Sequence, residues 1–180
     1  MKATGVVRRI DDLGRIVIPK EIRKTLRIKE GTPLEIFTEK EGNIILKKYS
    51  PIGELANFSE QYVNSLFAVT SLIAVITDKD YVIAVSGVSK KDLLEKPISK
   101  ELEKIIDNRL PTKSSEDSII SIVDDNIINH NNKVVVPIIS DSEVIGSVIL
   151  SSKYNTEKIG ETEFEIAKVA ADFLGSQLEI

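Results

Sequence analysis

The chain has 180 residues, a formal net charge of −4 and 42% hydrophobic residues, which is an ordinary composition for a soluble globular protein. It contains no cysteine, which excludes disulfides, zinc–thiolate sites and cysteine catalysis and fits a reducing cytoplasm, and no apolar run approaches the roughly 20 residues that a membrane helix needs. Residues 1–50 hold 12 of the 24 basic and seven of the 28 acidic side chains, so they carry +5 and residues 51–180 carry −9. A basic end on an acidic body indicates that the first part meets a polyanion.

The first 30 residues predict two short strands and a helix. Residues 5–10 are rich in β-branched side chains and predict a strand, and residues 15–18 predict a second one. The Asp and Gly residues between them favour a turn, because Asp tolerates turn geometry and Gly adopts positive φ without a steric cost. Pro19 favours a helix start, because its missing N–H is not needed at the first helical position, and Gly31 is expected to end that helix.

Residues 34–38 and 43–48 predict a hairpin whose turn is formed by Glu41 and Gly42. A unit of about 50 residues buries only about 60% of the surface that its unfolded chain exposes, so it is marginal alone. The sequence therefore predicts a small N-terminal unit that needs a further source of stability.

This order of strand, turn, strand and helix resembles the AbrB-like, swapped-hairpin family of bacterial DNA-binding domains. The positions that carry the resemblance are Arg8, Asp11, Gly14, Arg15, Pro19, Ile22, Arg23, Leu26, Gly31, Leu34 and Glu35. The resemblance implies an all-β barrel with one short helix, in which the strands of two chains interleave. It therefore implies an obligate homodimer, in agreement with the small size of the unit.

The resemblance also implies which side chains contact double-stranded DNA. The matching positions are Arg8, Arg15, Arg23 and Lys24, with Arg9 as a flanking candidate. Arginine has a planar fork that can bind two acceptors on guanine, whereas Lys24 supplies charge alone. No base code is legible in these residues, so we expect specificity to depend on DNA shape. Without the resemblance, a solvated charged face would be an equally good interpretation of the basic segment.

Pro51 blocks continuation of the last strand, so the sequence predicts a domain boundary there, with domains at residues 1–51 and 52–180. From residue 52, apolar side chains recur at steps of three and four and predict an amphipathic helix. No flexible Gly/Ser linker precedes this helix. We therefore expect it to couple the two domains rather than only to tether them.

The second domain predicts a mixture of paired strands and helices. Strands are expected at residues 72–77, 81–86, 119–123, 134–140 and 143–151, helices at 89–95, 99–108 and 161–180, and polar loops at 113–117 and 124–132. This order resembles a GAF domain, an α+β sensor module with an antiparallel sheet, and the hairpin containing Val136, Pro137 and Gly146 carries that resemblance. With residues 83–92 and 96–99, the domain pair resembles a family of transcription regulators of spore development.

One candidate ligand site and one lone histidine stand out in the second domain. Ser86, Gly87, Ser89 and Lys90 form a candidate site for a small anion, and a helix N-cap on a surface loop is the alternative interpretation. His130 has no partner residue at metal-ligand spacing and is interpreted as an exposed loop residue. No nucleophile elbow, phosphate-cradling loop or paired carboxylates are recognisable. We therefore expect no catalytic residues, no metal and no cofactor.

The last helix carries two apolar stripes. The first stripe consists of Phe164, Ala167, Ala171, Leu174 and Leu178, and the second of Ile166, Ala170, Phe173 and Ile180. One stripe is enough to pack on the domain's own sheet, and two suggest a partner as well. We expect the first stripe to form the contact between sensor domains. A helix buried on two sides within one chain is the alternative.

These features predict a DNA-binding transcription regulator, activator and repressor, that is cytoplasmic and nucleoid-associated and is not an enzyme. Its expected partners are double-stranded DNA, a second chain in a homodimer, two more chains in a homotetramer joined by the GAF-like domains, and a small-molecule ligand of unidentified chemistry, but no membrane. The alternative is an antitoxin whose hairpin domain binds DNA and whose C-terminal part neutralises a toxin enzyme. Antitoxins usually end in a short disordered tail, whereas this chain has a larger, patterned second half.

Overall fold

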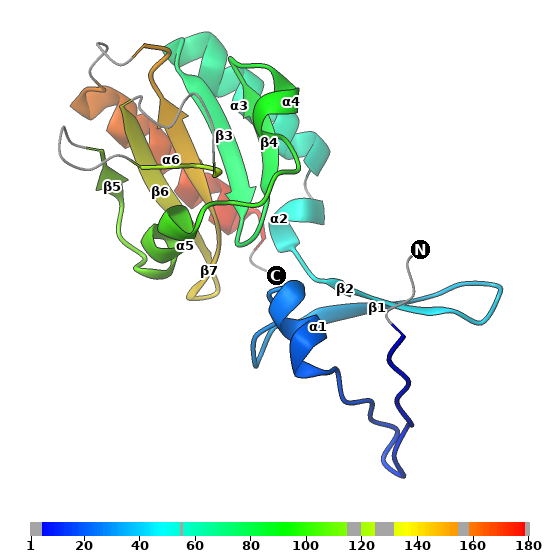
Figure 1. The fold of residues 1–180 in the computed structure, drawn as a ribbon. Helices are drawn as coiled ribbons and strands as arrows, with labels where there is room; N and C mark the ends of the chain where they lie inside the picture. Colours follow the sequence, from blue (N-terminus) through cyan, green and yellow to red (C-terminus); the bar gives the residue numbers. More distant parts are fainter. Residues whose placement is uncertain (1–4, 55, 115–119, 125–131, 155–158, 179–180) are drawn as a thin grey trace. The chain divides into compact units, whose positions relative to one another are not determined.

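The structure is a computed structural model that describes residues 5–54, 56–114, 120–124, 132–154 and 159–178 (Figure 1). The chain divides into two compact units, Met1–Tyr49 and Ser50–Ile180. Ser50 belongs to the second unit through its side chain: its Oγ donates a 2.9 Å hydrogen bond to Oδ2 of Asp78 and accepts a 3.0 Å hydrogen bond from the Gly53 N–H. Pro51 opens the first helix of that unit, where its fixed φ suits the first helical turn.

The first unit contains helix α1 (Lys20–Thr25) and an antiparallel hairpin of β1 (Leu34–Thr38) and β2 (Ile44–Lys48), as the sequence predicts. The two strands predicted at residues 5–10 and 15–18 do not form. These segments are joined by a turn in which the Gly14 N–H donates to the Asp11 carbonyl at 3.0 Å. A strand needs a hydrogen-bonded neighbour, and no described segment of the chain pairs with them.

Helix α1 ends at Thr25, six residues before Gly31, which is earlier than predicted. Arg27, the residue after the C-cap, adopts a left-handed φ of 52°, and the Ile28 N–H donates to the Arg23 carbonyl at 2.8 Å. With the Arg27 N–H bonded to the Lys24 carbonyl, this is a Schellman motif. The prediction was wrong because glycine usually takes the left-handed position, and here an arginine takes it.

No residue from 5 to 49 is buried in the single chain. Its exposed large hydrophobic residues are Val6, Val7, Ile10, Leu13, Ile16, Val17, Leu26, Ile36, Phe37, Ile44, Leu46 and Tyr49. The exposed fraction reaches 85% at Val7 and 71% at Val17. A monomeric protein rarely exposes so many large apolar side chains in so short a segment, and residues 5–49 of one copy do not contain a hydrophobic core.

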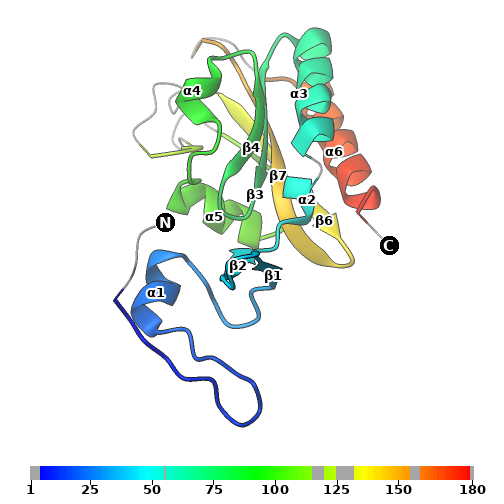
Figure 2. The ribbon, with the colours of Figure 1, turned by 90° about the vertical axis from the view of Figure 1, so that its right-hand side faces the viewer.

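The second unit is a five-stranded antiparallel sheet in the order β4-β3-β7-β6-β5, with helices on both faces (Figure 2). The strands are β3 (Ile73–Asp78), β4 (Val82–Ser86), β5 (Thr112–Lys113), β6 (Lys133–Ser140) and β7 (Glu143–Ser151). Helices α2 (Pro51–Glu54), α3 (Ala56–Thr70) and α6 (Glu161–Ser176) lie on one face, and α4 (Lys90–Leu93) and α5 (Lys100–Asp107) lie on the other. The two faces hold separate apolar clusters, which together form the core. None of the helices in the described ranges is long and apolar enough to cross a membrane.

The β6–β7 hairpin is present as predicted. Asp141 and Ser142 both have positive φ, 49° and 64°, which is the type I′ turn whose twist suits a two-residue hairpin loop. Side chains of β6 alternate between the two apolar clusters, with Val134 and Val136 facing α6 and Val135 facing α5. The central strands therefore read as apolar runs because both of their faces are buried.

Ile120, Ile122 and Val123 are buried, but residues 120–123 do not form the predicted strand. They are tied to the start of α5: Oγ of Ser99 donates to the Ser121 carbonyl at 2.6 Å, and the Ser99 N–H donates to the Ile122 carbonyl at 2.8 Å. Ser99 also caps the helix by accepting a 3.0 Å hydrogen bond from the Leu102 N–H. The prediction was wrong because a short apolar run does not distinguish a strand from a buried loop. His130 lies outside the described residues.

The predicted interface stripe of α6 packs inside its own domain. Ala167, Ala171 and Leu174 are at most 2% exposed and belong to the cluster between the helices and the sheet. Gly175 allows this close packing, because a Cβ there would lie 2.1 Å from the Ile139 carbonyl oxygen. With these side chains covered by the chain's own sheet, no surface of theirs remains for a partner, and this part of the prediction was wrong.

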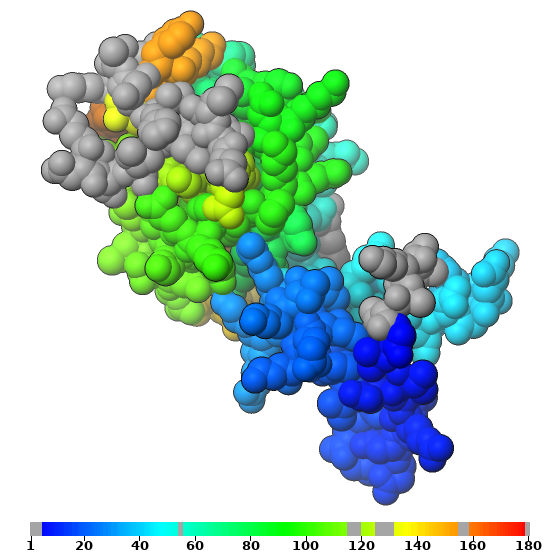
Figure 3. Space-filling model, in the orientation of Figure 1, coloured from blue at the N-terminus to red at the C-terminus, as the bar shows by residue number. Residues whose placement is uncertain are grey.

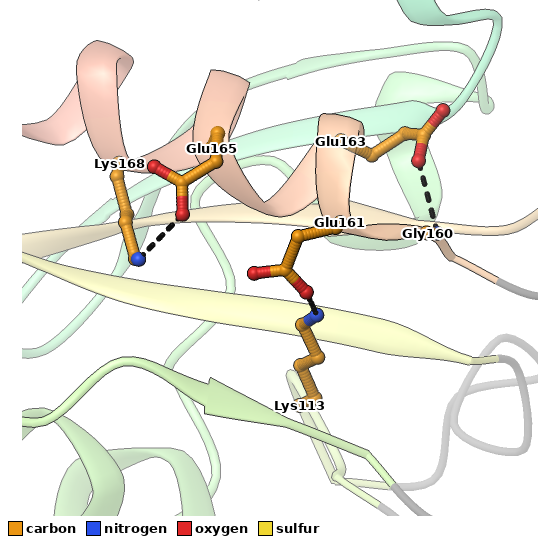
Figure 4. A network of polar contacts seen from close by, with 6 residues as sticks. All are labelled: Lys113, Gly160, Glu161, Glu163, Glu165 and Lys168. Atoms are coloured by element: carbon orange, nitrogen blue, oxygen red, sulfur yellow. Dashed lines mark hydrogen bonds and ion pairs between the residues drawn. The ribbon is translucent and has the colours of Figure 1, made fainter.

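Phe164, another member of that stripe, is half-buried. Figure 4 shows Lys113 and Lys168, the two lysines that lie over its ring, with their glutamate partners. The ammonium groups of Lys113 and Lys168 lie 4.3 and 4.5 Å from its ring centroid. Lys113 pairs with Glu161 at 2.6 Å and Lys168 with Glu165 at 2.7 Å, and the Lys113 ammonium group holds the pKa of the Glu161 carboxyl below its usual value. Phe164 therefore joins β5 to α6 within one chain, and the partly buried Leu178 packs against the same core.

The outward faces of α3 and α6 carry an aromatic cluster that the structure brings together. Phe173 lies 5.7 Å from Tyr62 and 6.1 Å from Phe58, measured between ring centroids. Val69 and Val169 are 77% and 67% exposed on the same two helices. We call these five residues the α3–α6 ridge. Phe173 belongs to the second stripe of the sequence analysis.

Candidate nucleic-acid interface

The turn at residues 11–14 holds Arg15 in place. Oδ1 of Asp11 accepts the N–H groups of Leu13 at 3.0 Å and of Arg15 at 2.8 Å, and Oδ2 accepts the Arg15 Nε–H at 2.8 Å. Hydrogen bonds from the Arg15 backbone and guanidinium group lower the pKa of Asp11, so this carboxylate remains charged at neutral pH. The terminal amino groups of Arg15 form no hydrogen bond with any described residue and remain available to an acceptor.

Helix α1 carries the next two candidates in its last turn, Arg23 and Lys24. The Nε–H of Arg23 donates to the Ile18 carbonyl at 3.2 Å, which leaves the two terminal amino groups of its planar fork without a partner among the described residues. Lys24 is exposed and forms no ion pair within the described part of the chain. None of the residues of α1 is buried, so packing against a core does not restrict its basic side chains.

Arg8 and Arg9 are exposed in the segment before the turn. Nη1 of Arg8 donates a 3.1 Å hydrogen bond to the neighbouring Val7 carbonyl, a local contact that does not fix its direction in space. The segment and its turn form a lobe of the first unit's surface, dark blue in Figure 3. All five candidate side chains are therefore exposed cations on one unit, and their contact with DNA stays a prediction.

The candidate anion site in the second unit has different surroundings from those expected. Lys90 pairs with Glu60 of α3, so its charge is already partly neutralised. Gly87 has a φ of 91°, and a Cβ there would lie 2.8 Å from the Phe67 ring, so this glycine serves close packing. Ser89 precedes α4 without capping it through its side chain. Of the four candidates, only Lys90 lines a cavity of about 340 Å³ beside β4.

Sequence reasoning missed two features of the second unit. It did not identify Glu60 and Glu95, which line that cavity, because they lie 35 residues apart in the chain. It also missed the α3–α6 ridge, although Phe58 and Tyr62 share one helix face at i and i+4. That spacing was a signal in the sequence that Phe58 and Tyr62 lie together. The contact of Tyr62 with Phe173 could be found only in the tertiary structure.

Known proteins resemble each unit separately. Residues 7–54 match a family described as antidote-toxin recognition MazE, bacterial antitoxin. Over 51 residues the chain is 59% identical to the transition state regulatory protein AbrB of Bacillus subtilis (strain 168), which covers 28% of this chain and 52% of that protein. The GAF domain of an Acinetobacter phosphoenolpyruvate-protein phosphotransferase matches with a TM-score of 0.57 at 12% identity, covering 73% of this chain and 84% of that chain. An AbrB-like domain is therefore followed by a GAF-like domain with an antiparallel sheet, and both predicted domain classes are confirmed. The interleaving of two chains in the first unit stays a prediction.

The whole chain also has a full-length relative. It is 49% identical to stage V sporulation protein T of Bacillus subtilis (strain 168) over 179 residues, which is 99% of each chain. Residues 54–179 match the family described as stage V sporulation protein T C-terminal, transcription factor. The chain belongs to the stage V sporulation protein T family of transcription factors.

Proposed function

We propose that this transcription factor binds double-stranded DNA through its first unit and controls genes of spore development, as an activator at some and a repressor at others. The observation that carries the proposal is the set of exposed cations around the 11–14 turn and α1. Arg15 and Arg23 each bind protein through Nε alone, so their terminal amino groups are available to phosphate or base acceptors. Asp11 orients Arg15 in advance, which reduces the entropy lost on binding.

Binding to DNA predicts a strong dependence on salt and on individual arginines. Arg15→Ala or Arg23→Ala should weaken binding by about 1–3 kcal/mol if the lost side chain contacts a base, and a lost phosphate contact should also reduce the salt slope by about 1. Fluorescence anisotropy with operator DNA at several salt concentrations would measure both quantities.

Lys40→Ala is the matched control, because Lys40 is an exposed cation of the same unit near the β1–β2 turn and is not among the candidates. It should change affinity only slightly. Unchanged binding in both arginine variants would mean that the basic face is only solvated surface.

We further propose that a second chain completes the first unit as a homodimer. The segments at residues 5–10 and 15–18 have strand-like sequences but no neighbouring strand, and Val7, Val17 and Phe37 lie exposed. Interleaving with a second copy would provide both the missing strand partners and the cover for these apolar side chains. This arrangement would also place two sets of basic side chains on one DNA duplex.

A fragment comprising Met1–Tyr49 should therefore be a dimer that melts at a temperature that rises with protein concentration, because folding and association are one event. Circular dichroism melts over a hundredfold range of concentration, with sedimentation to measure mass, would test this. A folded monomer whose melting temperature is independent of concentration would contradict the interleaved barrel.

For the homotetramer, we propose that the α3–α6 ridge replaces the inner stripe of α6 as the contact between sensor domains. Its exposed valines and stacked aromatic rings form an apolar surface of the kind that helix–helix interfaces bury. If two DNA-binding dimers are joined, binding of the first dimer raises the effective concentration of the second one at a neighbouring site on the same DNA.

The same proposal has consequences for location and for the alternatives. A DNA-bound regulator would be cytoplasmic and nucleoid-associated. We also propose that it is not an enzyme, needs no cofactor and does not bind a membrane. The match of residues 7–54 to the MazE family agrees with the alternative function, an antitoxin. It is not better supported, because the relative that covers the whole chain is a sporulation protein and the second half is a folded domain.

A further inference from the structure

A cavity of about 340 Å³ lies beside β4, the edge strand of the sheet. Helices α2 and α3 line one side of it, and α4 with the segment up to residue 95 lines the other. All of these residues belong to the second unit. The volume is at the low end of the range of about 300–1,000 Å³ for small-molecule sites, so the cavity suits a ligand the size of one aromatic ring with a short side chain.

The floor of this β4 cavity is apolar and is held in place by the core. The apolar side chains that it offers to a ligand are the half-buried Ile83 and Leu94 and the 47% exposed Tyr81. Val82, Ala84 and Val85 also line the cavity, but they are at most 2% exposed and support this surface from within the core. A ligand would therefore find a preformed apolar surface for its body.

The charged residues of the β4 cavity have an excess of carboxylates. Asp78, Glu60 and Glu95 face one cation, Lys90. The Asp78 carboxylate is already hydrogen-bonded within the protein. It accepts hydrogen bonds from the N–H groups of Asp80 at 2.7 Å and Tyr81 at 2.6 Å and from the Ser50 hydroxyl at 2.9 Å.

Glu60 and Glu95 differ in what they contact. Glu60 pairs with Lys90 across the cavity, from α3 to α4, and both side chains are about half exposed. The Glu95 carboxylate forms no ion pair with any described residue. The cavity therefore has one carboxylate, Glu95, without an ion-pair partner among the described residues, and one, Glu60, whose ion pair is partly exposed to solvent. The net charge of its lining is negative, which is opposite to the charge that would attract a small anion.

We propose that the β4 cavity binds a small organic cation: a primary ammonium group on a compact apolar body. The ammonium group contacts Glu95 and Glu60, and the body lies against Tyr81 and Leu94. Charge complementarity selects the ammonium group, and the apolar floor selects the body. The ligand class is thus the reverse of the anion that Lys90 suggests in the sequence.

This site deepens the proposed regulation of DNA binding and rests on that proposed function for its biological meaning. A bound cation would touch α3, which follows α2 and the first unit in the chain, and also α4, so it would add a second link beside the Glu60–Lys90 pair. A ligand shifts DNA affinity only by the difference between its affinities for two arrangements of these helices.

The direct test is an NMR titration of the full-length protein with 2-phenylethylamine, 2-phenylethanol and 3-phenylpropanoate, which share a phenyl group but differ in charge. The amine should cause saturable shifts in α3, β4 and α4 with a dissociation constant of about 1 mM, a value typical of a ligand this small. It should bind about two- to fivefold more tightly than the neutral alcohol, as expected for partly exposed ion pairs. Equal affinity for amine and alcohol, or tighter binding of the carboxylate, would overturn the proposal.

Two variants locate the site. Glu95→Gln keeps the shape of the side chain and should remove most of the preference for the amine, and Ala56→Leu adds volume to an exposed position that lines the cavity and should abolish saturable shifts. Glu143→Gln, at the start of β7 outside the cavity lining, is the control and should bind like the wild type. Amine binding unaffected by both cavity variants would place the ligand elsewhere and refute the site.

The folded state of each variant is checked by its amide spectrum, and DNA affinity is measured separately without amine. Loss of DNA binding with normal amine binding would count against the proposed function alone. Normal DNA binding without any amine binding would count against this inference alone.

Discussion

Replacing Leu174 by alanine is expected to destabilise the second unit by about 2–5 kcal/mol, the range for removing a large buried aliphatic side chain. Leu174 is fully buried in the cluster between α6 and the sheet. The backbone of α6 already lies against Ile139 at the neighbouring Gly175, so the helix cannot move closer to fill the space. Urea denaturation followed by circular dichroism of the full chain would measure the loss.

Phe173→Ala is the matched variant, because the two residues are adjacent in the chain and point about 100° apart around α6, so that they lie on different faces. Phe173 is 41% exposed and contacts Phe58 and Tyr62, so its loss should cost the single domain only about 1 kcal/mol, the scale of such ring contacts. If the α3–α6 ridge joins sensor domains, light scattering should show a tetramer becoming a dimer. A smaller assembly with unchanged stability for Leu174→Ala, and no effect for Phe173→Ala, would restore the inner stripe as the interface.

The free energy of unfolding is expected to rise between about pH 8 and pH 10.5 because of Lys133. This side chain is 1% exposed at the start of β6, and its burial lowers the pKa from 10.5 to about 8, although the nearby Glu101 carboxylate opposes the shift. Within that window the unfolded chain binds more protons than the folded one, so stability increases with pH. The lowering of the pKa from 10.5 to about 8 corresponds to about 3 kcal/mol in the free energy of unfolding. This is the free-energy cost, below pH 8, of keeping the buried ammonium group charged.

Lys133→Met should therefore stabilise the protein by up to about 3 kcal/mol at pH 7 and remove most of the rise at high pH. Lys79→Met, at an exposed position in the β3–β4 turn, should leave the pH dependence unchanged and controls for the loss of one positive charge. Denaturation at a series of pH values would compare the three proteins. A rise of equal size in Lys133→Met would show that other groups cause it.

Local features of this protein were predictable because they depend on neighbours in the chain. The β6–β7 hairpin follows from Asp141 and Ser142 between two apolar runs, and α5 follows from the apolar spacing of Leu102, Ile105 and Ile106. The basic first unit and its AbrB-like pattern are likewise properties of a continuous segment. Periodicity also showed that the last helix has two apolar stripes.

Only the tertiary structure decided which surface each of these elements meets. Periodicity defines the faces of a helix but not what covers them, so Leu174 was assigned to a partner although its own sheet covers it. The β4 cavity joins Glu60 and Glu95 through the packing of α3 and α4 around an edge strand, which no local pattern encodes. The segments at residues 5–10 and 15–18 show the same dependence, because strand-like sequence forms a strand only where a neighbour accepts its backbone hydrogen bonds.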